Sequence, residues 1–116
     1  DSLEDDAGAK PVTKILAESI AFINKLGGQF ELNQSKTTIV RVSLANTRVT
    51  DAELVRLQGL TKVFQLVLAD TQVTDAGLVH LDGLKDLRFL FLLNTQVTDA
   101  GVKKLQQALP NCKIIH

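Results

Sequence analysis

Few residues in this sequence are of the types that catalyse reactions or hold metal ions. The single cysteine, Cys112, lies four residues before His116, and a strand of that length would place the two side chains only roughly on the same side. The other histidine, His80, falls among predicted exposed helix positions. We interpret Cys112 as a buried structural thiol, because it occupies a position where the pattern described below requires an apolar residue. A reactive or metal-binding thiol is the alternative.

Three aspartates, Asp51, Asp75 and Asp99, recur at a spacing of 24 residues. If they lie on neighbouring strand-helix units, their carboxylates are about 5 Å apart along a line, and a ladder of bound cations is one interpretation. No other oxygen ligands recur beside them, so we favour carboxylates in the first turn of a helix, where the helix dipole stabilises them. Phosphate-binding glycine loops and paired metal-ligand motifs are missing from the sequence. We therefore expect no enzyme, no metal site and no cofactor.

The aspartates belong to a segment that occurs three times without insertions, at 46–54, 70–78 and 94–102. A fixed period in this range is typical of stacked supersecondary units, each of which buries its apolar side against the next. The sequence therefore predicts one domain built around these copies.

Each copy predicts a short strand, a turn and a helix. The strand positions expected to face the core are Ile39, Val42, Leu44, Val63, Leu66, Leu68, Leu87, Leu90 and Leu92. The threonines that follow the strands are Thr47, Thr71 and Thr95, and those expected to cap the helices are Thr50, Thr74 and Thr98. A hydroxyl in the turn can hydrogen-bond the bending backbone, and a hydroxyl at the N-cap can accept from a helix N–H.

The third copy carries the clearest signature, Leu87-x-x-Leu90-x-Leu92-x-x-Thr95 followed by Val97-Thr98-Asp99-Ala100-Gly101. It resembles the leucine-rich repeat, and it is similar to the bacterial class with 24-residue repeats and the sequence Thr-x-Val-Thr-Asp-Ala-Gly-Leu. The resemblance covers residues 39–115. It implies an α/β fold, a right-handed leucine-rich-repeat solenoid with a short parallel sheet on the concave side and helices on the convex side. It also implies that partners meet the concave sheet.

The rest of the chain is expected to cap the copies. Residues 1–10 are acidic, small and polar, and predict a flexible lead-in. An amphipathic helix from Pro11 to Leu26 and a hairpin strand form an N-terminal cap over 11–36. The copies then occupy 37–60, 61–84 and 85–109. A closing strand is predicted within 110–116, with Cys112 and Ile115 turned inward.

Composition excludes several classes of partner. Thirteen basic and thirteen acidic residues cancel, so no overall charge attracts nucleic acid or an anionic membrane. No apolar run approaches the roughly 18 residues of a membrane span. The sequence does not begin with methionine, and processing of an exported precursor is one explanation, although the sequence does not determine the compartment.

The outward side of the sheet is the most informative surface. Strand alternation turns apolar side chains outward in the third copy and polar or small ones in the first. The predicted partner-binding residues are Phe89, Phe91, Leu93, Val67, Gln65, Arg41 and Ile114. A contiguous apolar patch on a polar surface marks a site of contact. We expect a non-catalytic module that binds a partner protein through this face. The alternatives are a structural protein that pairs with its own copy, and covering of the patch by the chain itself.

Overall fold

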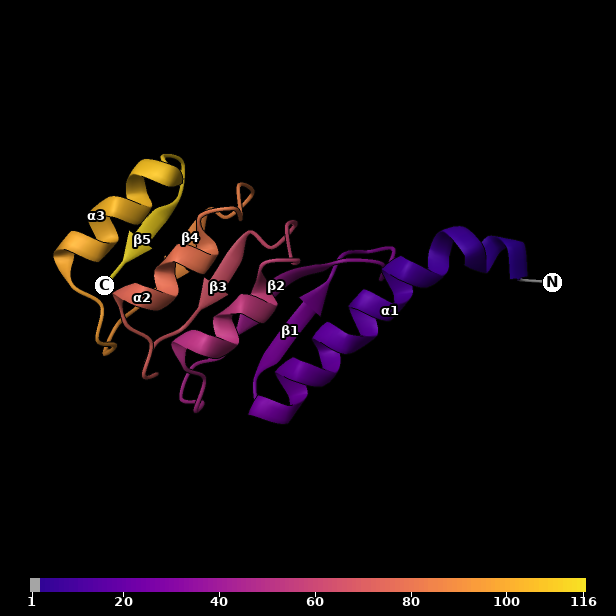
Figure 1. Ribbon diagram of the computed structural model, residues 1–116, viewed down its shortest axis with the longest axis horizontal. Helices are drawn as coiled ribbons and strands as arrows, with labels where there is room; N and C mark the ends of the chain where they lie inside the picture. The colour runs from indigo at the N-terminus through magenta and orange to yellow at the C-terminus, as the bar shows by residue number, and fades with distance from the viewer. Residues whose placement is uncertain (1–2) are drawn as a thin grey trace.

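The computed structural model describes residues 3–116, with side chains from Lys14 onward (Figure 1). The strands, which neighbour one another in chain order, are β1 (Gln29–Leu32), β2 (Ile39–Ser43), β3 (Gln65–Val67), β4 (Phe89–Phe91) and β5 (Lys113–Ile115). The helices are α1 (Leu3–Leu26), the 3₁₀ helix η1 (Asp51–Leu57), α2 (Asp75–Leu78), the 3₁₀ helix η2 (Val79–Leu81) and α3 (Asp99–Ala108).

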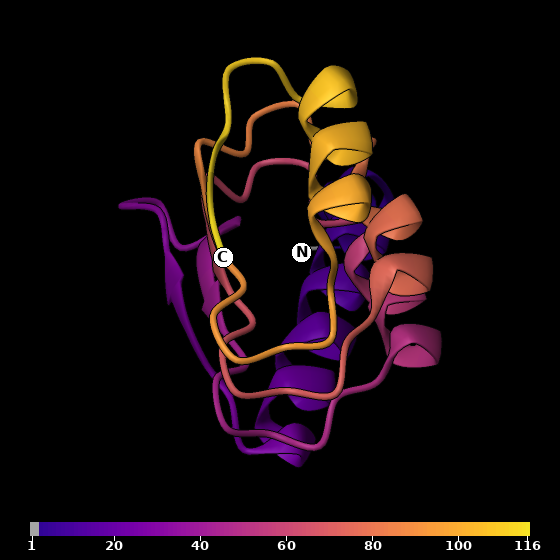
Figure 2. The ribbon, with the colours of Figure 1, turned by 90° about the vertical axis from the view of Figure 1, so that its left-hand side faces the viewer.

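The sheet is mixed. β1 pairs antiparallel with β2, whereas β2, β3, β4 and β5 are parallel to one another. Parallel neighbours need a crossover, and here each crossover contains a helical segment. These segments lie together on one face of the sheet, and the opposite face carries no helix in the described part of the chain (Figure 2). We call this uncovered side the open face.

One core lies between the sheet and the helices. The inward strand residues predicted from the sequence are all buried, for example Leu66 at 1% exposure and Leu90 at 0%. The same cluster extends into α1 through Phe22 and Ile23, and α1 packs against β1. α1 begins at Leu3 rather than at Pro11, and Asp1 and Ser2, the start of the expected flexible lead-in, lie outside the described residues.

The turns after three of the strands are built alike. Asn46, Asp70 and Asn94 adopt left-handed backbone angles, with φ of 61°, 60° and 59°, which asparagine and aspartate tolerate better than most residues. The residue that follows each of them is a threonine, and its hydroxyl donates back to a carbonyl at the end of the strand. The three bonds join Thr47 to Leu44 at 2.6 Å, Thr71 to Leu68 at 2.7 Å and Thr95 to Leu92 at 2.7 Å. The predicted role of these hydroxyls is confirmed.

The expected right-handed leucine-rich-repeat solenoid is wrong. The structure is a small α/β domain with a single mixed sheet, and its radius of gyration of 14.7 Å is near the value of about 13 Å for a compact chain of this length. The reason is that the three sequence copies do not form equivalent units. The segment after β2 is a 3₁₀ helix, the segment after β3 is one α-helical turn with a 3₁₀ turn, and only the segment after β4 is a longer α-helix. The domain shares one core, which α1 and β1 close at one end.

Candidate functional site

The register of the sheet brings the predicted site residues into two rows on the open face. One row contains Arg41, Gln65, Phe89 and Lys113, and the next contains Ser43, Val67, Phe91 and Ile115. Because side chains alternate along a strand, members of a row share a face and adjacent members are in contact distance. The structure therefore brings together six of the seven residues predicted from the sequence.

An apolar patch occupies the half of the open face formed by β3, β4 and β5. Phe89 is 40% exposed and Leu93, just after β4, is 47% exposed. Phe91, Val67 and Ile115 are half-buried. Moving a side chain of this size from full exposure to full burial is favourable by roughly 1.5 to 3 kcal/mol, and a partly exposed side chain forgoes part of that free energy. We call Phe89, Phe91, Leu93, Val67 and Ile115 the apolar patch.

Ile114 does not belong to this surface, and its prediction is wrong. It pairs in register with the fully buried Leu90 and packs against the core, whereas Ile115 and Lys113 face outward. The third copy is one residue longer than the others, and Ile115, which was predicted to turn inward, faces outward, so that prediction is wrong as well. The Cys112 N–H donates to the Leu109 carbonyl at 3.1 Å, as Val63 does to Leu60 and Leu87 to Leu84, so the extra residue lies before Leu109 and the offset returns to 24 between Cys112 and Lys113. The strand register consequently keeps the 24-residue offset.

The other half of the open face is polar. The Arg41 guanidinium lies 3.1 Å from the Glu31 carboxylate on β1 and stacks over the Phe64 ring, with 5.0 Å to its centroid. Gln65 is half-buried between these residues and the patch. Sequence reasoning missed Glu31, because its antiparallel pairing with Arg41 appears only once the hairpin register is known.

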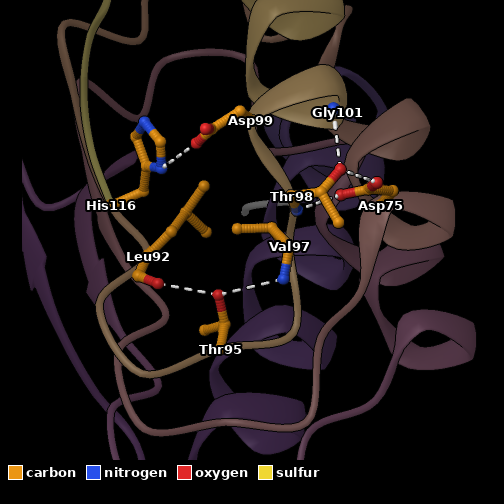
Figure 3. A network of polar contacts seen from close by, with 8 residues as sticks. All are labelled: Asp75, Leu92, Thr95, Val97, Thr98, Asp99, Gly101 and His116. Carbon is orange, nitrogen blue, oxygen red and sulfur yellow. Dashed lines mark hydrogen bonds and ion pairs between the residues drawn. The ribbon is translucent and has the colours of Figure 1, made fainter.

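The recurring aspartates bind threonines rather than cations. The Asp51 carboxylate accepts the Thr74 N–H at 2.7 Å and the Thr74 hydroxyl at 2.5 Å. The Asp75 carboxylate accepts the same two groups of Thr98 at the same two distances (Figure 3). These hydrogen bonds, from the Thr98 hydroxyl first and its backbone N–H second, lower the pKa of Asp75 below the ordinary value of 3.8, with desolvation opposing them.

Each of these threonines also caps a helix, so it connects the aspartate of one helix to the first turn of the next. The Thr98 hydroxyl accepts the Gly101 N–H at 3.3 Å while it donates to Asp75. Asp99 has no following threonine in the described chain and instead lies 3.6 Å from His116 Nδ1 (Figure 3). The carboxylates thus join successive helix starts, a role that neither interpretation of the sequence had included.

The remaining chemical candidates do not form a reactive site. Cys112 is buried, and desolvation raises the pKa of its thiol to about 11 although the Arg88 charge opposes the shift. A thiol with this pKa is protonated at neutral pH and is a poor nucleophile. His80 Nδ1 lies 3.3 Å from the Gln58 side-chain amide, at the surface. No group of three or more His, Cys, Asp or Glu side chains that could hold a metal occurs in the part of the chain that the structure describes.

A groove of about 700 Å³ runs between the helices on the covered side of the domain. Its walls include Ala76, Val79, Ala100 and Leu105, and its charged lining groups include Asp82 and Lys104. The Asp75 carboxylate at its edge is already bonded to Thr98. The groove therefore offers small apolar walls with few free polar groups, and it lies on the opposite face from the apolar patch.

Comparison with known proteins does not supply a function. No family model matches the chain, and no curated protein is significantly similar to it. The resemblance to bacterial 24-residue repeats therefore rests on the sequence motif alone. Within residues 3–116, none of the helices combines the length and the apolar character needed to cross a bilayer.

Proposed function

We propose that this chain is a non-catalytic module that binds a protein partner through the open face of its sheet. The observation that carries the proposal is the apolar patch: Phe89 and Leu93 remain 40% and 47% exposed on a face that no described helix covers. Contiguous apolar surface of this kind is characteristic of interaction sites.

The arrangement fits recognition by a preformed surface. The anchors Phe89 and Phe91 lie on a strand held by hydrogen bonds on both sides, so little conformational freedom is lost on binding. Aromatic anchors surrounded by polar groups are the usual places where interface energy is concentrated. Gln65, Arg41 and Lys113 supply such a polar rim.

A comparison of free energies indicates that burial of the apolar anchors must be supplemented by contacts with the polar rim. Phe89, Phe91 and Leu93 are already more than half-buried, so completing their burial contributes about 2 to 4 kcal/mol, less than half the value for fully exposed side chains. Association itself costs about 4 to 15 kcal/mol in lost translational and rotational freedom. The patch alone therefore supports weak binding, and polar contacts must add affinity and specificity.

A second candidate function is self-association through the same patch, in which the partner is another copy of this chain. Homodimer interfaces are more apolar than transient ones, which suits a surface with two phenylalanines. Sedimentation velocity over a range of concentrations separates the candidates. A chain that stays monomeric at high concentration would exclude self-association and leave a foreign partner as the candidate.

The experiment that tests the proposal compares Phe91→Asp with Val79→Asp, an apolar, 49% exposed position on the helical side. We expect Phe91→Asp to abolish binding of cross-linked partners, or self-association, because a carboxylate in the patch must be desolvated. Val79→Asp should retain both. Circular dichroism and thermal unfolding verify that each variant is folded. Partners retained by a folded Phe91→Asp variant, or lost to the same extent in Val79→Asp, would contradict the proposal.

A further inference from the structure

Two opposite charges stand at the two ends of the apolar patch. Lys113 on β5 is exposed and lies beside Phe89, at the start of the strands. Asp70 is exposed just after β3, and its N–H donates to the Leu93 carbonyl at 2.9 Å, so it adjoins the other end of the patch. Among described residues, the Asp70 carboxylate accepts only from the neutral side-chain amide of Asn94, at 2.9 Å, and neither charge belongs to an ion pair.

Other charged groups near this face are engaged within the chain. The Arg41 guanidinium lies 3.1 Å from the Glu31 carboxylate, on the polar half of the face. Arg88 donates to the carbonyls of Lys85 and Leu87, at 3.2 and 3.4 Å, before β4 begins. The charges that flank the patch most directly are therefore one lysine and one aspartate, which are of opposite sign.

These two charges occupy diagonally opposite corners of the patch. Lys113 is in the first row of outward residues, on β5, whereas Asp70 follows the end of β3. Phe91, on the middle strand β4, lies between them. A two-fold axis that lies between two facing patches and crosses this diagonal exchanges the corners, so that Lys113 of each copy meets Asp70 of the other. A two-fold interface makes every such contact twice.

We infer that the partner seated on the open face is a second copy of this chain, with the two apolar patches face to face and Lys113 of each copy paired with Asp70 of the other. This inference rests on the proposed function and names its partner. Each patch then meets an apolar surface of its own size, and each flanking charge meets the opposite one, whereas like charges at these corners would repel. The formal net charge is zero, so no overall repulsion opposes the approach of two copies.

The dimer is expected to be weak. The anchors Phe89, Phe91 and Leu93 are already more than half-buried in the single chain, so pairing removes only the remainder of their surface from water. Ion pairs at the rim of an interface add little each. Association should therefore appear only as the protein concentration rises, and sedimentation equilibrium from the micromolar to the millimolar range detects dimers of this kind.

Charge reversal at the two corners tests the inference in the full chain. In a dimer of Lys113→Asp the new carboxylate faces Asp70, and in a dimer of Asp70→Lys the new ammonium faces Lys113. Each variant alone should therefore dimerise about tenfold more weakly than the wild type. An equimolar mixture of the two variants should dimerise as tightly as the wild type, because unlike copies restore both opposite pairs.

Matched controls make the same charge changes on the helical side of the domain. Lys103→Asp and Asp82→Lys replace exposed residues there, and each alone and their mixture should sediment like the wild type. Asp70→Lys places a lysine at a left-handed φ of 60°, and Lys36 already adopts a φ of 58° in this chain. Circular dichroism verifies that every variant is folded.

The outcomes separate this inference from the proposed function. A wild type that stays monomeric up to millimolar concentration, or a mixture that associates no better than its separate components, would overturn the pairing of two copies. Equal effects of Lys113→Asp and Lys103→Asp would overturn it as well. If Phe91→Asp nevertheless abolishes the binding of cross-linked partners, the open face binds a foreign protein, and the proposed function stands without this inference.

Discussion

The Asp75 carboxylate shows how one side chain stabilises a neighbouring segment. It accepts both the N–H and the hydroxyl of Thr98, which in turn caps α3. The sequence predicted the cap and placed the aspartate in the first turn of its own helix. It could not predict their contact, because the two residues are 23 positions apart and meet only when neighbouring strands pair in register. The sequence nevertheless contained a signal for this contact, because Asp51 and Thr74 are separated by the same 23 positions as Asp75 and Thr98.

Replacement of Thr98 by valine should raise the pKa of Asp75 toward 3.8, because the two hydrogen bonds from Thr98 are what lower it and the larger of them is lost. A lowered folded-state pKa means that Asp75 stabilises the fold above the unfolded-state pKa, and that this contribution disappears as the pH falls through the lower folded-state value. The wild type should therefore lose more stability than Thr98→Val between about pH 5 and strongly acidic pH. Carboxyl NMR titration and acid unfolding measure both effects. Thr61→Val, at an exposed position, is the control, and an unchanged Asp75 pKa in Thr98→Val would contradict the assignment.

At the scale of elements, glycine decides how closely neighbouring helices approach. A Cβ built on Gly101 would overlap the Asp75 carboxylate, and one built on Gly77 would overlap that of Asp51. The first copy has Glu53 at the matching place, where its carboxylate accepts the Thr50 N–H at 2.9 Å and no earlier aspartate competes for the space. The sequence predicted where the strands and caps lie, but it did not distinguish 3₁₀ from α-helical segments, since that difference depends on how each helix packs against its neighbour.

We expect Gly101→Ala to destabilise the domain by about 1 to 3 kcal/mol, the usual cost of an added carbon in a filled space. Gly83→Ala is the control, since a methyl group at that position would meet no atom within 4 Å and the backbone φ is ordinary, so it should be neutral or slightly stabilising. In an Asp75→Ala background the cost of Gly101→Ala should shrink, because the overlapping group is gone. Urea unfolding of the single variants and the double variant measures this, and a cost that is unaffected by Asp75→Ala would show that the carboxylate is not the obstacle.

At the scale of the whole molecule, one continuous core joins α1 to the last strand. The sequence favoured stacked equivalent units because its apolar positions repeat with a constant period. That period does describe the strand register, in which Gln65 and Phe89 are aligned. It does not describe the helices, the antiparallel strand β1 or the shared core, and these features make the structure a compact domain. The patch residues on β3 and β4 were predictable from alternation, whereas Ile114 was not, because the extra residue in the third copy is compensated only just before β5.

A shared core predicts cooperative unfolding. Ile23 on α1 is fully buried, so Ile23→Ala should destabilise the entire domain by about 2 to 5 kcal/mol. Calorimetry should still show a single transition with equal calorimetric and van't Hoff enthalpies. Ile15→Ala, on the same helix but 52% exposed, should have little effect. Separate transitions for α1 and for the sheet would contradict a single core.

The glycines that accommodate Asp51 and Asp75 also fix the place of the first copy, the only one without a glycine at this position. If the first copy were moved into second place, Glu53 would have to occupy the space that Gly77 leaves for the carboxylate of the preceding copy. A shuffled gene would thus encode nearly the same series of residues and yet bring two acidic groups into collision. The first and second copies therefore cannot be exchanged in the folded protein, although their sequences are similar.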